Sequence, residues 1–265
     1  MLDRFEQLPK EGALSIFYTA GYPRLKDTMT ILGILERAGV NMVEVGFPFS
    51  DPVADGPTIQ ASNMVALEGG MSITELFAQL RGMRKEISIP VLLMGYLNPV
   101  EQFGVEQFLS QASDCGVDGL IVPDMPFEEY RVRYKTLYGR YGVKPVFLVT
   151  SRTEKQRIRE FDSEDPAFLY VVSSEAVTGS KAVISEEQRA FYERLREMNL
   201  SSRLIVGFGV SSRADFEAVT SHTHGAIIGS AFIRSLANIS HGSDGEFSDP
   251  AELERRISEF VRQYR

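Results

Sequence analysis

Two carboxylates on either side of a proline-containing loop are the residues best suited to chemistry in this chain. Glu44 lies within the apolar run 42–47, and Asp55 follows Pro52 and precedes Gly56. A carboxylate buried in a strand is costly unless it is paired, hydrogen-bonded or protonated, so a chain retains one most readily where chemistry needs it. Two carboxylates in different environments can supply an acid and a base at one pH. The pattern predicts an acid–base site if the loop brings Asp55 back toward Glu44.

Glycines that follow three successive apolar runs form the second candidate site. They include Gly179, Gly209 and Gly229, the last followed by Ser230. Glycine allows backbone N–H groups to approach an anion closely, although a tight turn is the simpler explanation for any one of them. Three such loops at neighbouring strand ends favour a phosphorylated substrate.

The residues that would supply metal or Schiff-base chemistry are not where such chemistry needs them. Two of the three histidines, His222 and His224, precede a predicted strand rather than follow it, and the third is His241. No lysine ends a predicted strand, since Lys144 begins one and Lys181 lies in a loop. We therefore expect no metal site. An aldolase-like cleavage here would depend on carboxylates alone.

Eight short apolar runs must position these groups. Most are apolar at nearly every position, as in parallel strands that are covered on both faces, and amphipathic helical patterns fill the gaps. This alternation matches a single-domain (β/α)8 TIM barrel of the α/β class better than an open sheet. In that fold active sites lie at the C-terminal strand ends, often with phosphate after the last two strands. The predicted strands are residues 14–19, 42–47, 90–96, 119–123, 145–150, 167–173, 203–210 and 225–229.

Extra helices are expected at both ends of the barrel. We predict an N-terminal helix over residues 1–10, a short linker over 240–248 and a C-terminal helix over 249–265. The apolar stripe of the last helix consists of Leu253, Ile257, Phe260 and Val261. Capping-box signatures, in which a serine is followed three residues later by an acidic residue or glutamine, begin at Ser72, Ser151, Ser185 and Ser212.

Composition restricts the class of partner. The net charge of −8 argues against nucleic acid or an anionic membrane as the main partner, while a small anionic substrate could still be bound by local donors. No run approaches the roughly 18 apolar residues of a membrane span, and the N-terminus carries charges where a signal peptide needs an apolar segment. The single cysteine, Cys115, excludes an intramolecular disulfide and fits a reducing compartment. We expect a cytoplasmic protein.

Four further residues at strand ends are candidates for the site. Asp124 ends the fourth predicted strand and could bind substrate, orient a loop or cap the next helix, of which capping or loop support is the favoured role. Phe17, Tyr96 and Tyr170 lie near strand ends and could line an apolar pocket, although core packing explains them almost as well.

The longest motif in the chain points to a known family. Residues 44–60 read Glu-Val-Gly-Phe-Pro-Phe-Ser-Asp-Pro-Val-Ala-Asp-Gly-Pro-Thr-Ile-Gln. Shorter motifs are Thr-Ala-Gly-Tyr-Pro at 19–23, Leu-Ile-Val-Pro-Asp at 120–124, Val-Thr-Gly at 177–179, Val-Gly-Phe-Gly-Val at 206–210 and Ile-Gly-Ser-Ala at 228–231. From about residue 5 to 239 the chain resembles the tryptophan synthase α chain. The resemblance implies a lyase that cleaves indole-3-glycerol phosphate to indole and glyceraldehyde 3-phosphate in L-tryptophan biosynthesis.

The family also implies a role for each candidate residue. Glu44 would be the general acid/base, which protonates indole C3 and assists loss of the glycerol hydroxyl proton. Protonated C3 creates an electron sink, so neither metal nor lysine is required. Asp55 would accept a hydrogen bond from the indole N–H, Thr178 would engage Asp55 when a lid closes, and Tyr170 would line the site. The phosphate would be held by Gly179, Phe208, Gly209, Gly229 and Ser230.

A partner chain is implied as well. The family pairs this chain with a pyridoxal-phosphate β chain in an α2β2 heterotetramer and passes indole to it through a tunnel. No cofactor is expected in this chain, because the pyridoxal phosphate would belong to the partner. The expected contacts are an exposed loop and a turn, at Pro48, Phe49, Asp51, Pro52 and Asn98.

One segment departs from the family pattern. Where the family runs Ser-Arg-x-Gly-Val-Thr-Gly, this chain has Ser174 in place of the arginine and Ala176 in place of the glycine, with Glu175 between them. A lid of this kind excludes water and completes a site, so the changes bear on turnover more than on fold. The alternative to an active lyase is therefore a catalytically weak subunit that mainly binds and activates its β partner.

Overall fold

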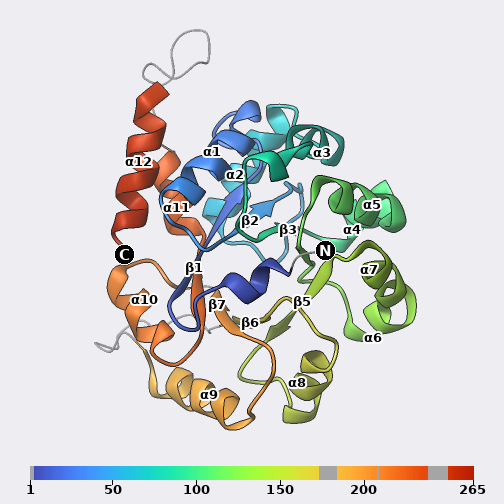
Figure 1. The fold of residues 1–265 in the computed structure, drawn as a ribbon, viewed down its shortest axis with the longest axis vertical. Coiled ribbons are helices and arrows are strands. Elements are labelled where there is room, and N and C mark those ends of the chain that lie inside the picture. The colour runs from blue at the N-terminus through green and yellow to red at the C-terminus, as the bar shows by residue number, and fades with distance from the viewer. Residues whose placement is uncertain (1–2, 173–183, 208, 238–249) are drawn as a thin grey trace.

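The computed structural model describes residues 3–172, 184–207, 209–237 and 250–265. Eight parallel strands close into a barrel in sequence order, and helices surround it (Figure 1). The strands are β1 Ala13–Thr19, β2 Met42–Gly46, β3 Val91–Met94, β4 Gly119–Ile121, β5 Lys144–Val149, β6 Leu169–Val172, β7 Leu204–Gly207 and β8 Gly225–Ile228. The (β/α)8 prediction is confirmed, and every predicted run contains a strand.

Helices connect successive strands and cover the outside of the barrel. They are α1 Thr28–Arg37, α2 Pro57–Glu68, α3 Ile73–Leu80, α4 Leu97–Phe103, α5 Val105–Cys115, α6 Phe127–Glu129, α7 Lys135–Tyr141, α8 Lys155–Asp162, α9 Glu186–Glu197, α10 Arg213–Thr220, α11 Ser230–Leu236 and α12 Pro250–Arg262. A π-helical segment, Tyr130–Tyr134, joins α6 to α7. None of the helices in the described ranges has the length and apolar character needed to cross a bilayer.

Side chains that point into the barrel form an inner core. It contains Phe17, Met42, Leu92, Ile121, Val146, Phe168, Tyr170, Ile205 and Ile227. Phe5 and Leu8 join this core from the segment that precedes β1, so the N-terminus closes one end of the barrel. The helix expected over 1–10 is only a 3-10 helix, Arg4–Gln7, within the described residues. Leu8 is extended because the residue before a proline avoids the helical region.

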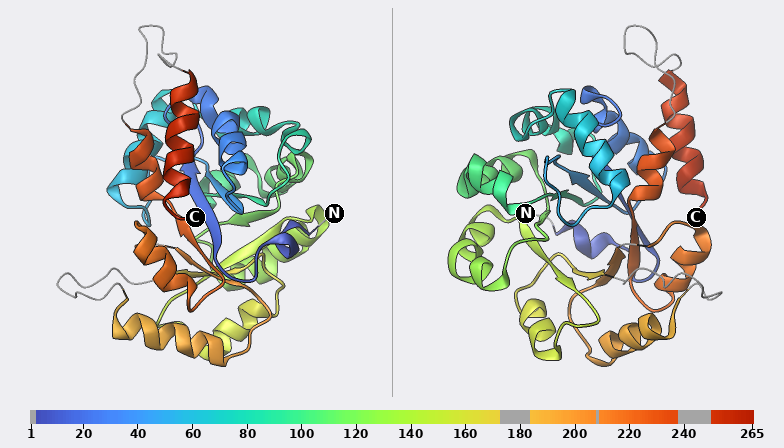
Figure 2. Two further views of the ribbon diagram at one scale, coloured as in Figure 1. Left: turned by 60° about the vertical axis from the view of Figure 1, so that its left-hand side comes forward. Right: turned by 180° about the vertical axis from the view of Figure 1, so that it is seen from behind.

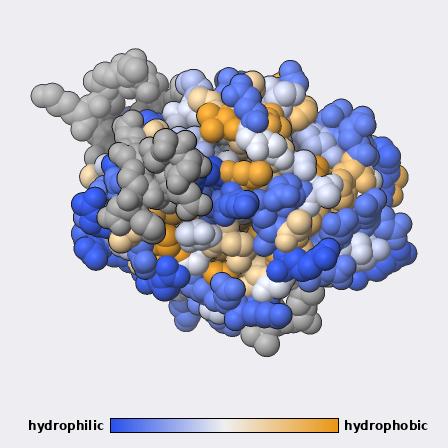
Figure 3. Space-filling model, turned by 90° about the horizontal axis from the view of Figure 1, so that it is seen from above, coloured by the Kyte–Doolittle hydropathy of each residue, from blue (hydrophilic) through white to orange (hydrophobic). Residues whose placement is uncertain are grey.

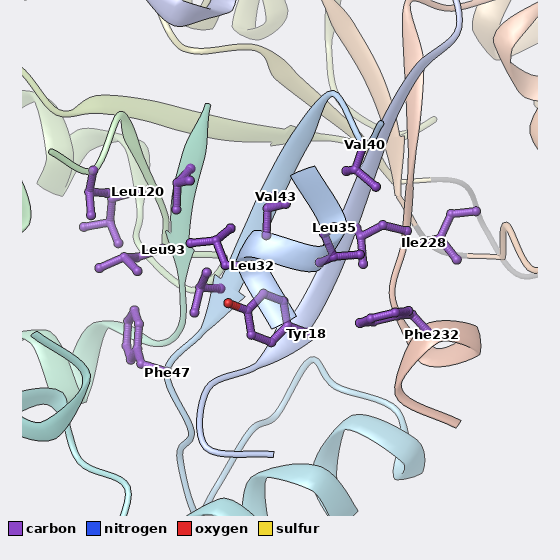
Figure 4. Close-up of a cluster of buried hydrophobic side chains, with 14 of the residues drawn as sticks. Tyr18, Leu32, Leu35, Val40, Val43, Phe47, Leu93, Leu120, Ile228 and Phe232 are labelled. Carbon is purple, nitrogen blue, oxygen red and sulfur yellow. The ribbon is translucent and has the colours of Figure 1, made fainter. Parts of the chain in front are cut away.

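A second, larger core lies between the barrel and its helices. Figure 4 shows part of it, with Val43 of β2, Leu32 and Leu35 of α1 and Phe232 of α11 among the side chains. The C-terminal helix extends this layer, since α12 lies against α1 and α11 (Figures 1 and 2). All four residues of its predicted stripe, Leu253, Ile257, Phe260 and Val261, are buried. On the face drawn in Figure 3, hydrophilic side chains predominate at the periphery.

Serine caps fix the start of three helices, as predicted. Ser72 accepts a hydrogen bond from the Glu75 backbone N–H, and reciprocal capping boxes begin α9 at Ser185 and α10 at Ser212. The prediction at Ser151 is wrong, because α8 has Glu154 as its N-cap and no side-chain cap bond. Residues 150–153 form a turn before the helix instead, in which the Thr153 hydroxyl accepts the Thr150 backbone N–H at 2.9 Å.

Candidate active site

A cavity of about 220 Å³ lies at the C-terminal ends of the strands. Its wall combines residues from β1, β3, β6 and β8 with α2 and the segments that follow β2, β7 and β8. The structure brings together six of the residues expected from the sequence, namely Phe17, Asp55, Tyr170, Gly209, Gly229 and Ser230. Residues that are far apart in the chain therefore share one cavity at the end of the barrel where this fold places active sites.

Glu44 lies next to that cavity but is not part of its wall. The residue is fully buried in β2, where Phe17 is its register partner on β1. The Ser15 hydroxyl donates to Oε1 at 3.4 Å, and no described residue offers a hydrogen bond to Oε2. Burial raises the pKa of Glu44 to about 8, against the smaller opposing effect of the Ser15 hydrogen bond. The carboxyl is therefore largely protonated at neutral pH and can donate a proton.

Asp55 has a different environment at the edge of the same cavity. It is partly exposed, and burial raises its pKa to about 6, while a hydrogen bond with Tyr96 opposes the shift. The Tyr96 hydroxyl also accepts the Ala54 backbone N–H at 3.0 Å, which ties the loop to the end of β3. Asp55 is therefore largely ionised at neutral pH, when Glu44 is not.

Tyr170 lines the cavity together with Asp55. Burial raises the pKa of Tyr170, and the negative charges of Glu44 and Asp55 raise it further. Space for the ring comes from Gly207, because a Cβ there would lie 2.0 Å from the Tyr170 hydroxyl oxygen. Gly46 does the same for Phe17, with a Cβ position 2.6 Å from that ring. Two glycines at strand ends thus leave room for aromatic walls, a role that differs from anion binding.

The expected phosphate end of the site is formed by the loops after β7 and β8. Gly209 adopts a positive φ of 76°, which favours glycine, and Gly229 and Ser230 begin α11. Arg234 also lines the cavity, and sequence reasoning missed it. The available signal was its spacing, because a residue four positions after Ser230 lies on the same helix face. Several predicted residues lie outside the described part of the chain. They are Thr178, Gly179, Phe208 and, in the segment that departs from the family pattern, Ser174, Glu175, Ala176 and Lys181.

Two other candidates support loops. Tyr96 lines a small second cavity with Asp55. Asp124 lines neither cavity, and its Oδ1 accepts the Leu97 backbone N–H at 2.9 Å at the start of α4. Asp124 thus holds the loop after β3 to the loop after β4, which is the loop support favoured from the sequence, although it caps α4 rather than the helix after it.

The loop expected to contact a partner is only partly exposed. Pro48 and Pro52 are buried and Phe49 is partly buried, whereas Asp51 is exposed and Val53 is 85% exposed. The Phe49 and Tyr96 rings lie 5.6 Å apart, which anchors the loop to the site. Asn98 is exposed, but it lies in the first turn of α4 rather than in the predicted turn.

The histidines that precede β8 have a structural environment. His224 Nδ1 accepts the Leu204 backbone N–H at 2.9 Å, at the N-terminal end of β7 and therefore opposite the cavity. Among the described residues, no group of three or more His, Cys, Asp and Glu side chains could hold a metal ion.

Known proteins resemble the chain over almost its full length. A family model described as tryptophan synthase alpha chain matches residues 5–262. The tryptophan synthase alpha chain of Parabacteroides distasonis is 45% identical over 257 residues, which are 97% of each chain. That of Bacteroides thetaiotaomicron is 46% identical over 238 residues, 89% of this chain and 93% of the relative.

Solved structures agree with the sequence matches. The tryptophan synthase A-subunit of Pyrococcus furiosus superposes with a TM-score of 0.82 at 30% identity, covering 96% of this chain and 98% of that one. A chain of Mycobacterium tuberculosis tryptophan synthase gives 0.82 at 25% identity, covering 98% and 95%.

Proposed function

This chain belongs to the tryptophan synthase alpha chain family, and we propose that Glu44 and Asp55 are the catalytic residues of its reaction. That reaction is the lyase cleavage of indole-3-glycerol phosphate to indole and glyceraldehyde 3-phosphate, in tryptophan biosynthesis. One observation carries the assignment of residues. Beside a single cavity, burial holds the pKa of one carboxyl at about 8 and that of the other at about 6, so an acid and a carboxylate coexist at neutral pH.

Glu44 supplies the proton that starts the cleavage. Protonation of indole C3 produces an indolenine, whose C=N bond accepts the electron pair of the breaking carbon–carbon bond. The glycerol hydroxyl on the departing carbon loses its proton and becomes the aldehyde of glyceraldehyde 3-phosphate. Glu44, ionised by the first transfer, recovers this proton. Because Glu44 is buried outside the cavity wall, its side chain must rotate toward the substrate to reach C3.

Asp55 stabilises the charge that this protonation creates. In the indolenine the positive charge rests on the ring nitrogen, and an ionised carboxylate that accepts the N–H hydrogen bond is the favourable neighbour. Asp55 is suited to this role because its pKa of about 6 leaves it charged at neutral pH. Phe17 and Tyr170 form apolar walls for the indole, and Gly209, Gly229 and Ser230 bind the phosphate at the other end of the cavity. Gly179 and Phe208 belong to the same proposed phosphate site, and Thr178 to the lid.

The partner and its cofactor are part of the same proposal. A β chain that carries pyridoxal phosphate would dock against the loop with Asp51 and Val53 and against Asn98, which are exposed, to form an α2β2 complex. No cofactor is assigned to this chain. The family's biosynthetic role and one free, buried cysteine fit a cytoplasmic location.

An assay of indole release from indole-3-glycerol phosphate tests the function, with the chain alone and with a β chain. We expect turnover in both conditions and faster turnover with the β chain. The alternative of a weak subunit is not favoured, because the relatives match nearly the whole chain. If neither condition released indole while the chain still accelerated β-chain catalysis, that alternative would replace the lyase.

A further inference from the structure

Arg234 is the cation of the cavity wall. Of the described residues that line the cavity, it alone carries a positive charge, and Asp55 is the one carboxylate among them. It lies one helical turn after Ser230 on α11, so the two side chains share a face of that helix. The Arg234 side chain therefore lines the same part of the cavity wall as Gly229 and Ser230.

The guanidinium also contacts the helix that follows the Asp55 loop. Its Nη1 donates to Thr58 Oγ1 at 3.4 Å, and Thr58 lies in the first turn of α2, just after Asp55 and its neighbour Gly56. Within the described ranges this is the one hydrogen bond that the Arg234 side chain makes, and no carboxylate there pairs with it. A guanidinium beside a cavity, whose remaining N–H groups have no acceptor among the described residues, can bind a ligand.

The positive charge of Arg234 favours a phosphate ester as the ligand. The backbone N–H groups and the Ser230 hydroxyl of the site are neutral, whereas a phosphate ester brings up to two negative charges. The chain as a whole carries a net charge of −8, so its overall field repels such an anion and a local cation must compensate. Arginine presents several donors in a planar fork that matches phosphate oxygens.

We propose that Arg234 binds the phosphate of the substrate and, through Thr58, couples that binding to the position of the Asp55 loop. The inference rests on the proposed phosphate end of the site and extends it by a charged residue and a link to the catalytic loop. Binding energy from the non-reacting phosphate would then help to hold Asp55 where the indole nitrogen requires it. Arg234 binds substrate directly, while Thr58 is a positioning residue.

Removing the charge tests the first half of the proposal. In the full-length chain, Arg234→Gln should weaken inhibition by glyceraldehyde 3-phosphate and by inorganic phosphate about 10- to 100-fold, as for the loss of a charge-assisted hydrogen bond. Affinity for indole, which has no phosphate, should stay within about twofold. Arg234→Lys should restore part of the phosphate affinity, because it keeps the charge without the planar fork. Folding should be preserved, since Arg234 is exposed.

A matched control is Arg140→Gln, which removes another exposed guanidinium, one that pairs with Glu106 far from the cavity wall. It should leave both affinities unchanged. Equal phosphate affinity in Arg234→Gln and the native chain would overturn the proposal, as would an equal loss of phosphate and indole affinity, which would indicate a general disturbance of the site.

The coupling has its own test in Thr58→Val, which removes the hydroxyl but keeps a side chain of similar shape. We expect kcat to fall about three- to tenfold with little change in phosphate affinity, and an unchanged kcat would overturn the coupling. These outcomes are separable from the lyase assignment. A native chain that releases no indole contradicts the proposed function, whereas an active native chain with a fully active Arg234→Gln variant contradicts only this inference.

Discussion

Two buried carboxyls at opposite ends of the barrel have opposite environments. Asp118, before β4 at the N-terminal end, accepts hydrogen bonds from the guanidinium groups of Arg4 and Arg84 and from the Val91 backbone N–H. Glu44, in β2, has one hydrogen bond from Ser15, and Oε2 has none from any described residue. Both are shielded from water, so burial alone does not distinguish them.

The number of partners separates a structural carboxyl from a reactive one. Burial raises the pKa of Asp118 too, but two guanidinium groups oppose this rise, and the carboxylate holds the N-terminal segment, the turn before β3 and the start of β4 together. An unsatisfied buried carboxyl instead avoids ionisation by keeping its proton, which is the property that an acid catalyst needs. The same residue chemistry therefore stabilises the fold at one end of the barrel and supports the reaction at the other.

The largest expected effect is the loss of activity in Glu44→Gln. Glutamine keeps the shape but cannot donate and recover a proton, so kcat for indole release should fall about 10²- to 10⁴-fold, the usual contribution of a general acid–base group. Binding of glyceraldehyde 3-phosphate should remain close to that of the native chain. Native-like turnover by this variant would remove Glu44 from the mechanism.

Asp118→Ala should show the reverse behaviour. It leaves two guanidinium groups without their shared carboxylate, and breaking a buried ion pair from one side costs about 3–5 kcal/mol. Urea unfolding should report this loss, while kcat of the folded protein should change little because Asp118 is at the far end of the barrel. Arg140→Ala, at an exposed pair, is the control and should cost about 1 kcal/mol or less. A stable Asp118→Ala variant with impaired kcat would contradict the structural role assigned to Asp118.

Glu44→Gln should also stabilise the fold, increasingly with pH. The pKa of Glu44 rises from an ordinary 4.5 to about 8 on folding, so between these values the unfolded chain is ionised while the folded chain keeps its proton. The native protein therefore loses stability as pH rises through this window, and glutamine does not. At pH 7 the variant should gain roughly 3 kcal/mol at most, since each pKa unit is worth about 1.4 kcal/mol. The free energies of unfolding of the two proteins should coincide near pH 4. A difference between them that stays constant with pH would contradict the raised pKa of Glu44.

The pH dependence of kcat/KM should be bell-shaped. Activity requires Asp55 ionised and Glu44 protonated, so the acid limb should lie near pH 6 and the alkaline limb near pH 8. Steady-state assays from pH 5 to 9.5 would measure both limbs. An Asp55→Asn variant should lose the acid limb along with most of its activity, and an unchanged acid limb would assign that pKa to another group.

The smallest effect is expected for Ser15→Ala. The hydroxyl of Ser15 favours the ionised form of Glu44, so its removal should raise the pKa of Glu44 and move the alkaline limb of kcat/KM upward by about half a unit to one unit. Ser15→Cys, a weaker donor, should give a smaller shift. A downward shift in Ser15→Ala would mean that Ser15 stabilises the protonated carboxyl instead.

Local sequence patterns predicted the fold well, because strand and helix formation depends mainly on side chains that are close together in the chain. Near-continuous apolar runs predicted eight strands, and the stripe of Leu253, Ile257, Phe260 and Val261 predicted a buried terminal helix. Strand ends were overextended, as at β7, which stops at Gly207 rather than at residue 210, because apolar residues also line the loops around the cavity. The cap at Ser151 failed since a neighbouring hydroxyl offered the backbone another turn.

Residues that act through distant partners were harder to predict. Asp118 and Arg234 have no unusual local sequence, and their significance comes from Arg4, Arg84 and Thr58, which lie elsewhere in the chain. Gly207 resembled part of a phosphate loop, yet its lack of a Cβ makes space for Tyr170. Such roles depend on contacts between separate elements, which a single sequence does not state.

By itself, the sequence determined the barrel, the family motif and the placement of Glu44 in a strand, because these follow from side-chain periodicity and from residues adjacent in the chain. Only the tertiary structure decided that Glu44 is enclosed with Ser15 as its one hydrogen-bond partner among the described residues, and that Asp55 and Arg234 line one cavity beside it. The physical reason is that burial and electrostatics arise when the barrel closes. A carboxyl's pKa depends on what surrounds it, and those surroundings come from strands far apart in the chain.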